Sequence, residues 1–429
     1  MIERYNTFEL NNIWKVESKI SFWKDISIKY ALSFIDQSLI DYNELNNIKI
    51  EEHEIIEREK TTKHEFLAFL EVLIEKSPEY LKKYIHYGLT SSDILDTTFS
   101  YQLKNSVIEI VKSLDNLLKT IFNKAIENKN IMMIGRTHGM YAEPISFGLV
   151  LLRFYYELNR SKTRLQNCIN TLSYGQLSGP IGNYTICNLD KEINILRSFN
   201  LNREDLSTQI IPRDRYAELF CTLGILASSI ENIATEIRQL SQSSICEVSE
   251  GFSKNQKGSS AMPHKKNPIG SENICGLSRL IRSYINPALE NIPLWYERDM
   301  SHSSNERFIG QDSTTLTHFV LNRLNNIIEN LIINEKNMNK NIESSLGLFF
   351  SQRLLIKLID KNIDRLNAYN IVQNLTFESF NKQQQFVNVL LNDYNIINIF
   401  TEQEIKNICD FTFFIEKNKE LWKELIKNE

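Results

Sequence analysis

The pattern of apolar and polar residues divides the chain into short helical segments at both ends and long ones between them. Residues 8–88 give short helical segments broken by polar connectors, among them the charged stretch EEHEIIEREKTTKHEF at 51–66. From Thr90, apolar residues recur at spacings of three and four for about ten turns, which predicts one long amphipathic helix. Residues 1–89 are therefore expected to form a first, N-terminal helical domain.

Four further long segments show the same helical spacing. They cover residues 143–172, 213–247, 268–286 and 314–342. Together with the helix from Thr90, they predict a long central bundle of five helices over residues 90–340. Beyond residue 341 the segments shorten again, which predicts a small helical third domain at 341–429.

Strand-like alternation is nearly absent, and TICNLD at 185–190 is the one candidate for a short hairpin arm. The predicted fold class is all-α, with three helical domains around the central five-helix bundle. Glycine (14 of 429 residues) and proline (8) are both scarce, which favours long helices with few forced turns. An all-helical fold specifies no chemistry, so function has to be sought in the connectors.

Charge and cysteine content narrow the class of protein. The net charge of −4, from 49 basic and 53 acidic residues without blocks, argues against a general nucleic-acid or membrane-surface role. Six widely spaced cysteines form no CxxC pair and no metal-binding pattern with histidine. The sequence shows no signal peptide and no run approaching about 18 apolar residues, so a cytoplasmic protein is expected.

The start of the first long helix carries a capping signal. Thr90 is followed three residues later by Asp93, a pairing whose hydroxyl and carboxylate can satisfy the free amides of a first helical turn.

The connector GFSKNQKGSSAMPHKKNP, residues 251–268, has the richest chemistry. Asn267 and Pro268 are suited to the N-cap and first position of the next helix. Free amides at that helix start, beside Lys265 and Lys266, predict an anion site for a carboxylate or phosphate. On the residues alone, a solvated and flexible basic loop remains an equal alternative.

Within this connector, GSSAMPHKKNP resembles the signature loop of the fumarase/aspartase superfamily. Six further blocks resemble that superfamily in the same order, so the resemblance covers essentially the whole chain. They are ERY (3–5), KHE (63–65), HYGLTSSDILDT (86–97), GRTHGMYAEP (135–144), TQIIPRDRYAE (208–218) and ERDMSHSSNERF (297–308). Within the superfamily, His264 and the HYGLTSSD and SHSSNER blocks resemble the adenylosuccinate lyases, whereas argininosuccinate lyases typically carry glutamine at the position of His264.

The resemblance implies a β-elimination that releases fumarate from an amine product. Ser259 matches the residue that removes the proton from carbon, although the residues alone also allow a plain loop hydroxyl. A serine can act as a base only if a neighbour or a positive field deprotonates it. Lys265, Asn267 and the amides at the helix start would hold the charge that develops on the carboxylate.

Histidines supply the other half of the implied chemistry. His138 matches the acid that protonates the departing nitrogen, a task suited to an imidazole with a pKa near 6.5. Glu272 matches the carboxylate that pairs with this histidine. His86 and His64 match two further positions near the substrate, and His264 and His302 are expected to be supporting groups.

The substrate-binding residues follow from the same resemblance. Arg4 and Tyr5 match the pair that holds the nucleotide phosphate, and Arg298, Ser303 and Arg307 match further phosphate and sugar contacts. Arginine's forked guanidinium suits phosphate oxygens. Thr90, Ser91, Thr137 and Gln209 match positions that hold the succinyl carboxylates or orient the ligand, although Thr90 and Ser91 are also explained as helix caps.

The resemblance also implies small-molecule nucleotide substrates, no metal, no organic cofactor, and a homotetramer whose active sites are shared between subunits. One departure concerns Lys63-His64-Glu65, where many relatives have Arg-His-Asp; lysine lacks the bidentate fork of arginine. Two alternatives stay open: another lyase of the superfamily, such as argininosuccinate lyase, and a binding or structural protein that reuses the fold without catalysis.

Overall fold

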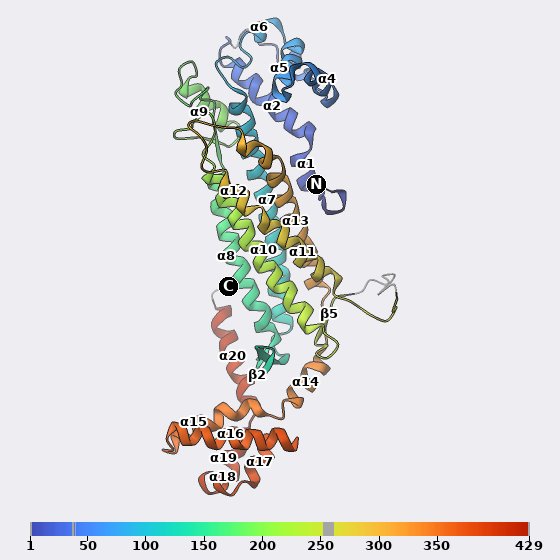
Figure 1. Cartoon of the computed structure of the whole chain (residues 1–429), viewed down its shortest axis with the longest axis vertical. Coiled ribbons are helices and arrows are strands. Elements are labelled where there is room, and N and C mark those ends of the chain that lie inside the picture. The colour runs from blue at the N-terminus through green and yellow to red at the C-terminus, as the bar shows by residue number, and fades with distance from the viewer. Residues whose placement is uncertain (1, 37, 39, 252–260, 428–429) are drawn as a thin grey trace. The chain divides into compact units, whose positions relative to one another are not determined.

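Figure 1 shows the computed structural model, which describes residues 2–36, 38, 40–251 and 261–427 and is dominated by helices. The fold class predicted from the sequence is confirmed. Short helices precede the first long one, as expected. They are η1 (Glu3–Tyr5), α1 (Phe8–Trp14), α2 (Val16–Leu32), α3 (Tyr42–Asn46), α4 (Glu52–Thr62), α5 (Glu65–Lys76) and α6 (Glu79–Lys82).

The prediction of a polar connector at 51–66 is wrong, because this stretch forms α4 and the start of α5. Glu51 and Glu54 make a reciprocal capping box at the start of α4, and Ile55 supplies its buried face. The many charges belong to the exposed face of an amphipathic helix.

All five long helices are present, with shifted ends. They are α7 (Ser91–Glu127), α8 (Phe147–Thr171), α10 (Asp214–Leu240), α11 (Ile269–Ser283) and α13 (Ser301–Glu329). The largest shift concerns α13, which begins before Thr314 because the Asp299 carboxylate accepts the amide of Ser301 (2.8 Å). It ends before Ile342 because Asn334 caps a separate helix, α14 (Glu335–Ser344).

One of these helices tests the expectation that no run is apolar enough to cross a membrane. By length and composition α10 could span a membrane, yet 67% of its most apolar stretch is buried inside the protein. It is accordingly a core helix, and its apolar character serves packing on several sides.

Small helices follow α14, as predicted for the C-terminal region. They are η3 (Leu348–Phe350), α15 (Ser351–Asp360), α16 (Arg365–Lys382), α17 (Phe386–Asn392), α18 (Tyr394–Ile399), α19 (Glu402–Ile408) and α20 (Thr412–Ile426). Two other short helices, α9 (Leu189–Arg197) and α12 (Ile285–Glu290), lie in connectors.

The chain forms two compact units, each assembled from three separated segments. Unit 1 contains Met1–Leu117, Leu158–Asn232 and Asn273–Leu324, and unit 2 contains Leu118–Glu157, Ile233–Glu272 and Asn325–Glu429. All five long helices contribute residues to both units. The division into domains at residues 89 and 340 stays a prediction.

Unit 1 combines an aromatic core with a buried ionic cluster. The ring of Trp23 packs edge-on against Phe66 and Phe69 at centroid distances of 5.4 and 5.3 Å. Elsewhere in the unit, Arg213 donates to both carboxylate oxygens of Asp96 and to Glu306 (3.1 Å). Breaking a buried pair of this kind leaves an uncompensated charge, so this cluster fixes the relation between α7 and α13.

In unit 2, apolar residues of the C-terminal helices pack with Met132 and Ile134 of a β-hairpin. The hairpin consists of β1 (Met132–Thr137) and β2 (Met140–Ser146), which pair antiparallel, with a register shift between Ile134 and Arg136. Two further strand pairs are short. They are β3 (Tyr174–Gly175) with β4 (Asn202–Arg203), which is parallel, and β5 (Val248–Ser249) with β6 (Ile332–Ile333), which is antiparallel.

The sequence pattern does not predict the β1–β2 hairpin, and the hairpin arm that it predicts at 185–190 is wrong. There, Asn188 caps α9 by accepting the amide of Lys191 (3.0 Å). The helical spacing that begins at Glu143 conceals β2, because residues 143–146 belong to the strand and α8 begins only at Phe147. The turn of the β1–β2 hairpin, His138-Gly139, has positive φ at both residues (54° and 78°), as a type I′ turn requires.

His86 occupies a left-handed turn between α6 and α7, with φ of 61°. Its ring lies 5.4 Å from that of Phe66, and its Nδ1 is buried without a hydrogen-bond partner among the described residues. Burial lowers the pKa of His86 from 6.5 to about 4. The imidazole is therefore neutral near pH 7.

This burial predicts a pH-dependent contribution to stability. Because the folded pKa of His86 is lowered, the unfolded chain binds more protons between pH 6.5 and 4, and stability is lost as the pH falls through that range. Between pH 7.5 and 5 the wild type should lose about 2 kcal/mol more free energy of unfolding than His86→Asn, whose asparagine tolerates the left-handed turn.

Chemical denaturation at the two pH values measures this difference. The matched control is His53→Asn, at an exposed position of α4. Equal pH slopes for the wild type and His86→Asn would contradict a buried neutral imidazole. The contributions of all other titrating groups cancel in this difference, because the wild type and His86→Asn both contain them.

Candidate active site

The residues predicted from the sequence to form the site lie in both units. Unit 1 holds Arg4, Tyr5, His64, His86, Thr90, Ser91, Gln209, Arg298, Ser303 and Arg307. Unit 2 holds Thr137, His138, Lys265, Asn267 and Glu272, and Ser259 lies outside the described residues.

Three of the predicted phosphate and sugar contacts line one pocket of unit 1. Arg298, Ser303 and Arg307, at and before the start of α13, face a cavity of about 330 Å³. Two of the predicted ligand residues also meet directly, because Arg298 donates to the side-chain oxygen of Gln209 (2.8 Å). The structure thus brings together residues from two sequence blocks about 90 positions apart.

Residues of the buried ionic cluster of unit 1 also line this pocket. Burial, opposed by Arg213, raises the pKa of Glu306 to about 7. Burial and then the Arg213 charge lower the pKa of His302 to about 4, so this imidazole is neutral near pH 7. His302 therefore reaches the pocket wall as an uncharged ring.

The Lys63-His64-Glu65 block contributes its last residue to the lining of this pocket. Glu65 lines the same pocket and accepts from Lys19 at 2.6 Å, while its other oxygen lies 3.9 Å from Arg307. His64 caps α5 by accepting the amide of Leu67 through Nδ1 (3.4 Å). Glu65 is thus placed to orient Arg307, a contact that the sequence pattern does not predict.

Thr90 is anchored as a cap. Its amide (2.7 Å) and its hydroxyl (3.2 Å) both donate to one oxygen of Asp93, whose other oxygen accepts the amides of Ser178 (2.8 Å) and Gly179 (3.2 Å). Burial raises the pKa of Asp93 to about 7 despite these bonds. Since the Thr90 hydroxyl proton is engaged, Ser91 is the better placed of the two to donate to a ligand.

At the N-terminus, Arg4 is exposed in η1, and Tyr5 is held by its neighbours. The Tyr5 ring packs edge-on against Phe319 at 5.1 Å, and its hydroxyl accepts from Asn273 (3.4 Å). Asn273 is therefore a further polar group beside a predicted ligand residue, although no motif singled it out.

In unit 2, the hairpin turn presents His138 to solvent. Thr137 is the last residue of β1, and His138 follows in the two-residue turn, so both side chains are exposed on a pocket of about 1000 Å³. Histidine is one of the few residues enriched at positive φ, and Gly139 supplies the second left-handed position. The hairpin thus presents an accessible imidazole on a rigid support.

The segment after the signature loop differs from the prediction in two ways. The first helical bond runs from Glu272 to the carbonyl of Pro268 (3.0 Å), so Pro268 rather than Asn267 precedes α11 as its cap. The amides of Gly270 and Ser271 donate to Glu250 at 3.0 and 2.7 Å. Part of the predicted anion site is therefore occupied by an internal carboxylate.

Lys265, His264 and Glu272 are exposed, and Asn267 is half-buried. Among the described residues, no hydrogen bond joins Glu272 to His138 of the same chain. Glu250 takes up the amides of Gly270 and Ser271, so Lys265 and Asn267 are the predicted polar groups beside the start of α11.

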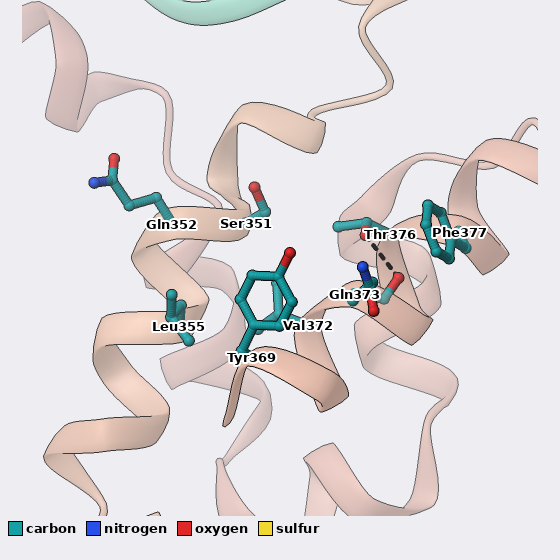
Figure 2. A pocket seen from close by; sticks show the side chains of 8 residues that line it. All are labelled: Ser351, Gln352, Leu355, Tyr369, Val372, Gln373, Thr376 and Phe377. Atoms are coloured by element: carbon teal, nitrogen blue, oxygen red, sulfur yellow. Dashed lines mark hydrogen bonds between the residues drawn. The ribbon is translucent and has the colours of Figure 1, made fainter. Parts of the chain in front are cut away.

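Another pocket, of about 390 Å³, lies between α15 and α16. Figure 2 shows that it is lined by hydroxyl, amide and apolar side chains, with Tyr369 beside Leu355 and Val372. No charged residue lines it, so it lacks the cations that an anionic ligand needs. None of the residues predicted from the sequence lies there.

Two comparisons with protein families match this chain. A family described as lyase matches residues 28–282, and one described as adenylosuccinate lyase C-terminus matches residues 347–425. Similar proteins named adenylosuccinate lyase occur in Thermotoga maritima (39% identical, covering 97% of each chain) and Aquifex aeolicus (39%, covering 100% of each). A third, from Helicobacter pylori, is 40% identical and covers 100% of each chain.

Solved structures share the fold at low sequence identity. A 3-carboxy-cis,cis-muconate lactonizing enzyme from Pseudomonas putida superposes with a TM-score of 0.84 at 21% identity, covering 95% of this chain and 93% of that one. A fumarate lyase from Mesorhizobium gives 0.85 at 19% identity, covering 96% and 95%. These likenesses establish the fold, and the relatives matched over the full length establish more: the chain belongs to the adenylosuccinate lyase family.

Proposed function

We propose that this protein cleaves adenylosuccinate to AMP and fumarate, and the corresponding succinyl-carboxamide imidazole ribotide to its amide and fumarate, as steps of purine synthesis. The observation that carries the proposal is the full-length similarity to adenylosuccinate lyases, at 39–40% identity, together with the intact signature loop. Both reactions are β-eliminations of a carbon–nitrogen bond.

The proposed mechanism assigns one role to each side of the bond that breaks. Ser259 removes the proton from the carbon beside a succinyl carboxylate, and the developing negative charge is held by Lys265 and Asn267. His138 donates a proton to the departing nitrogen, with Glu272 as its carboxylate partner and His86 beside the substrate. The exposure of His138 supports this assignment, since an acid must reach a ligand that arrives from solvent.

The nucleotide is proposed to bind in the 330 Å³ pocket of unit 1, which is lined by Arg298, Ser303 and Arg307. Two arginines suit a phosphate, because each guanidinium can give paired hydrogen bonds. Arg4 and Tyr5 are proposed as further phosphate contacts, and His64, Thr90, Ser91, Thr137 and Gln209 as contacts to the succinyl group or the base.

We also propose a cytoplasmic homotetramer whose active sites combine residues from different subunits. The support is that His138, Lys265 and Glu272 are all exposed and that no hydrogen bond joins them among the described residues, which leaves room for a second copy to complete their surroundings. The protein is proposed to need no metal or organic cofactor and to bind neither nucleic acid nor membrane.

An absorbance assay with purified protein and adenylosuccinate tests the function. We expect loss of the substrate band together with release of fumarate and AMP in equal amounts. Release of fumarate from argininosuccinate or aspartate instead would keep the reaction class and overturn the substrate. No turnover of any of the three would favour a non-catalytic binding protein.

Replacement of His138 tests the proposed acid. His138→Asn keeps a residue that tolerates the left-handed turn, and kcat should fall by about 10²- to 10⁴-fold because a positioned proton donor is lost. Gln383→Asn, at another exposed left-handed position of unit 2, is the matched control and should keep full activity. Wild-type kcat in His138→Asn, measured on the intact oligomer, would exclude this role.

Replacement of Ser259 tests the proposed base. Ser259→Ala removes the hydroxyl with little change in size, and fumarate release should fall to near the background rate. Substrate binding, measured by calorimetry on the same variant, should be retained because the binding groups are unchanged. Persistent turnover in a clean Ser259→Ala preparation would refute the assignment.

A further inference from the structure

Residues 247–250 (Glu-Val-Ser-Glu) carry two carboxylates that the proposed chemistry does not use. This segment lies between the end of α10 and the signature loop. Each carboxylate binds a different element of unit 2, and each of those elements carries residues of the candidate site. We call residues 247–250 the brace.

At one end, Glu247 holds the hairpin that carries His138. Its two oxygens accept hydrogen bonds from the two terminal nitrogens of Arg136, at 2.7 and 2.9 Å, in a bidentate ion pair. Glu247 is fully buried, and Asn341 donates to it as well (2.7 Å). Arg136 lies in β1, two residues before His138, so this pair fixes the strand from which the turn extends.

At the other end, Glu250 holds the start of α11. One oxygen accepts the amide and the hydroxyl of Ser271 (both 2.7 Å), and the other accepts the amide of Gly270 (3.0 Å). A Cβ on Gly270 would lie 3.0 and 3.2 Å from these oxygens, so a larger residue there would push the carboxylate back by a few tenths of an ångström. Asn267 precedes these amides by three residues, and Glu272 follows directly.

Between the two carboxylates, the backbone of the brace is fixed by strand pairing and by a further hydrogen bond. Val248 is buried, and β5 pairs with β6 through Val248–Ile333 and Ser249–Ile332. The carbonyl of Glu247 also accepts the amide of Asn334, the cap of α14 (2.9 Å). Four consecutive residues are thus fixed by side-chain and backbone bonds, which makes the brace a rigid spacer.

We infer that Glu247 and Glu250 are positioning residues: through the brace they set the hairpin of His138 and the start of α11, with Asn267 and Glu272, at a fixed spacing within one chain. This inference rests on the proposed function for its effect on catalysis. Neither carboxylate is proposed to contact the substrate. Each acts through the element it holds, because small displacements of reacting groups cost large factors in rate.

Glu247→Gln and Glu250→Gln test the inference in the full-length protein. A glutamine places an NH₂ group against a donor of Arg136 or Gly270. Each variant therefore loses one hydrogen bond of its carboxylate, with little change in side-chain volume. We expect kcat to fall about ten- to a hundredfold with KM changed by less than about threefold, and the double variant to lose less than the product of the two effects.

The matched control is Glu404→Gln. Glu404 likewise accepts an amide at a helix start, that of Thr401 (2.8 Å) at α19, but it holds no element of the candidate site. We expect its kcat to be unchanged. If the brace variants lose activity only in proportion to a lowered thermal midpoint, or keep wild-type kcat, the inference is overturned.

Hydrogen exchange gives a readout that does not depend on activity, so failure of the proposed function can be told apart from failure of the brace. In either brace variant, amides of both the hairpin (residues 136–141) and the first turn of α11 should exchange faster, because the brace transmits the loss to its other end. Faster exchange confined to the element that lost its own carboxylate partner would overturn the inference.

Discussion

The Arg136–Glu247 ion pair is the interaction on which the arrangement of unit 2 depends. A fully buried carboxylate is costly unless its charge is matched and its lone pairs are filled, and here the fork of one arginine and one asparagine amide do both. Because the partners come from β1, the brace and α14, none of these elements can move without uncovering a charge. The ion pair therefore fixes the position of the hairpin, and with it the position of the exposed turn that carries His138.

Carboxylates that bind backbone amides recur at the start of helices in both units. Asp93 joins the start of α7 to residues 178–179, and Glu250 joins the start of α11 to the segment before the signature loop. In each case the helix dipole and the free amides attract a negative group, and an internal side chain supplies it. The amides at the N-terminal ends of these helices therefore bind internal carboxylates and fix the neighbouring loops. Contacts to a ligand are left to side chains.

The sequence predicted the helices well because apolar spacing is a local signal that bundle packing does not override. The resemblance grouped Arg298, Ser303 and Arg307 as phosphate and sugar contacts; the three line one pocket, and their role stays a prediction. The sequence pattern failed where the signal depends on distant partners. The β1–β2 hairpin is held by packing with C-terminal helices, and nothing within residues 132–146 reveals that partner.

Glu247 and Glu250 were missed for the same reason. Each is an ordinary acidic residue until a strand or a helix start from elsewhere in the chain is brought against it. The capping role of Asp93, by contrast, was visible in sequence, since its partner Thr90 is three residues away; its bonds to Ser178 and Gly179 were not. Contacts between distant segments set the limit of what the pattern could predict.

The interleaving of the two units has a consequence during synthesis on the ribosome. Unit 2 needs Leu118–Glu157, yet its last segment begins only at Asn325. At translation rates of about 5–20 residues per second, the apolar strand with Met132 and Ile134 waits about 10–55 s for the helices that cover it. Throughout that interval the nascent chain exposes a strand edge and apolar side chains, so protection by a chaperone matters more for this protein than for one whose domains emerge one after another.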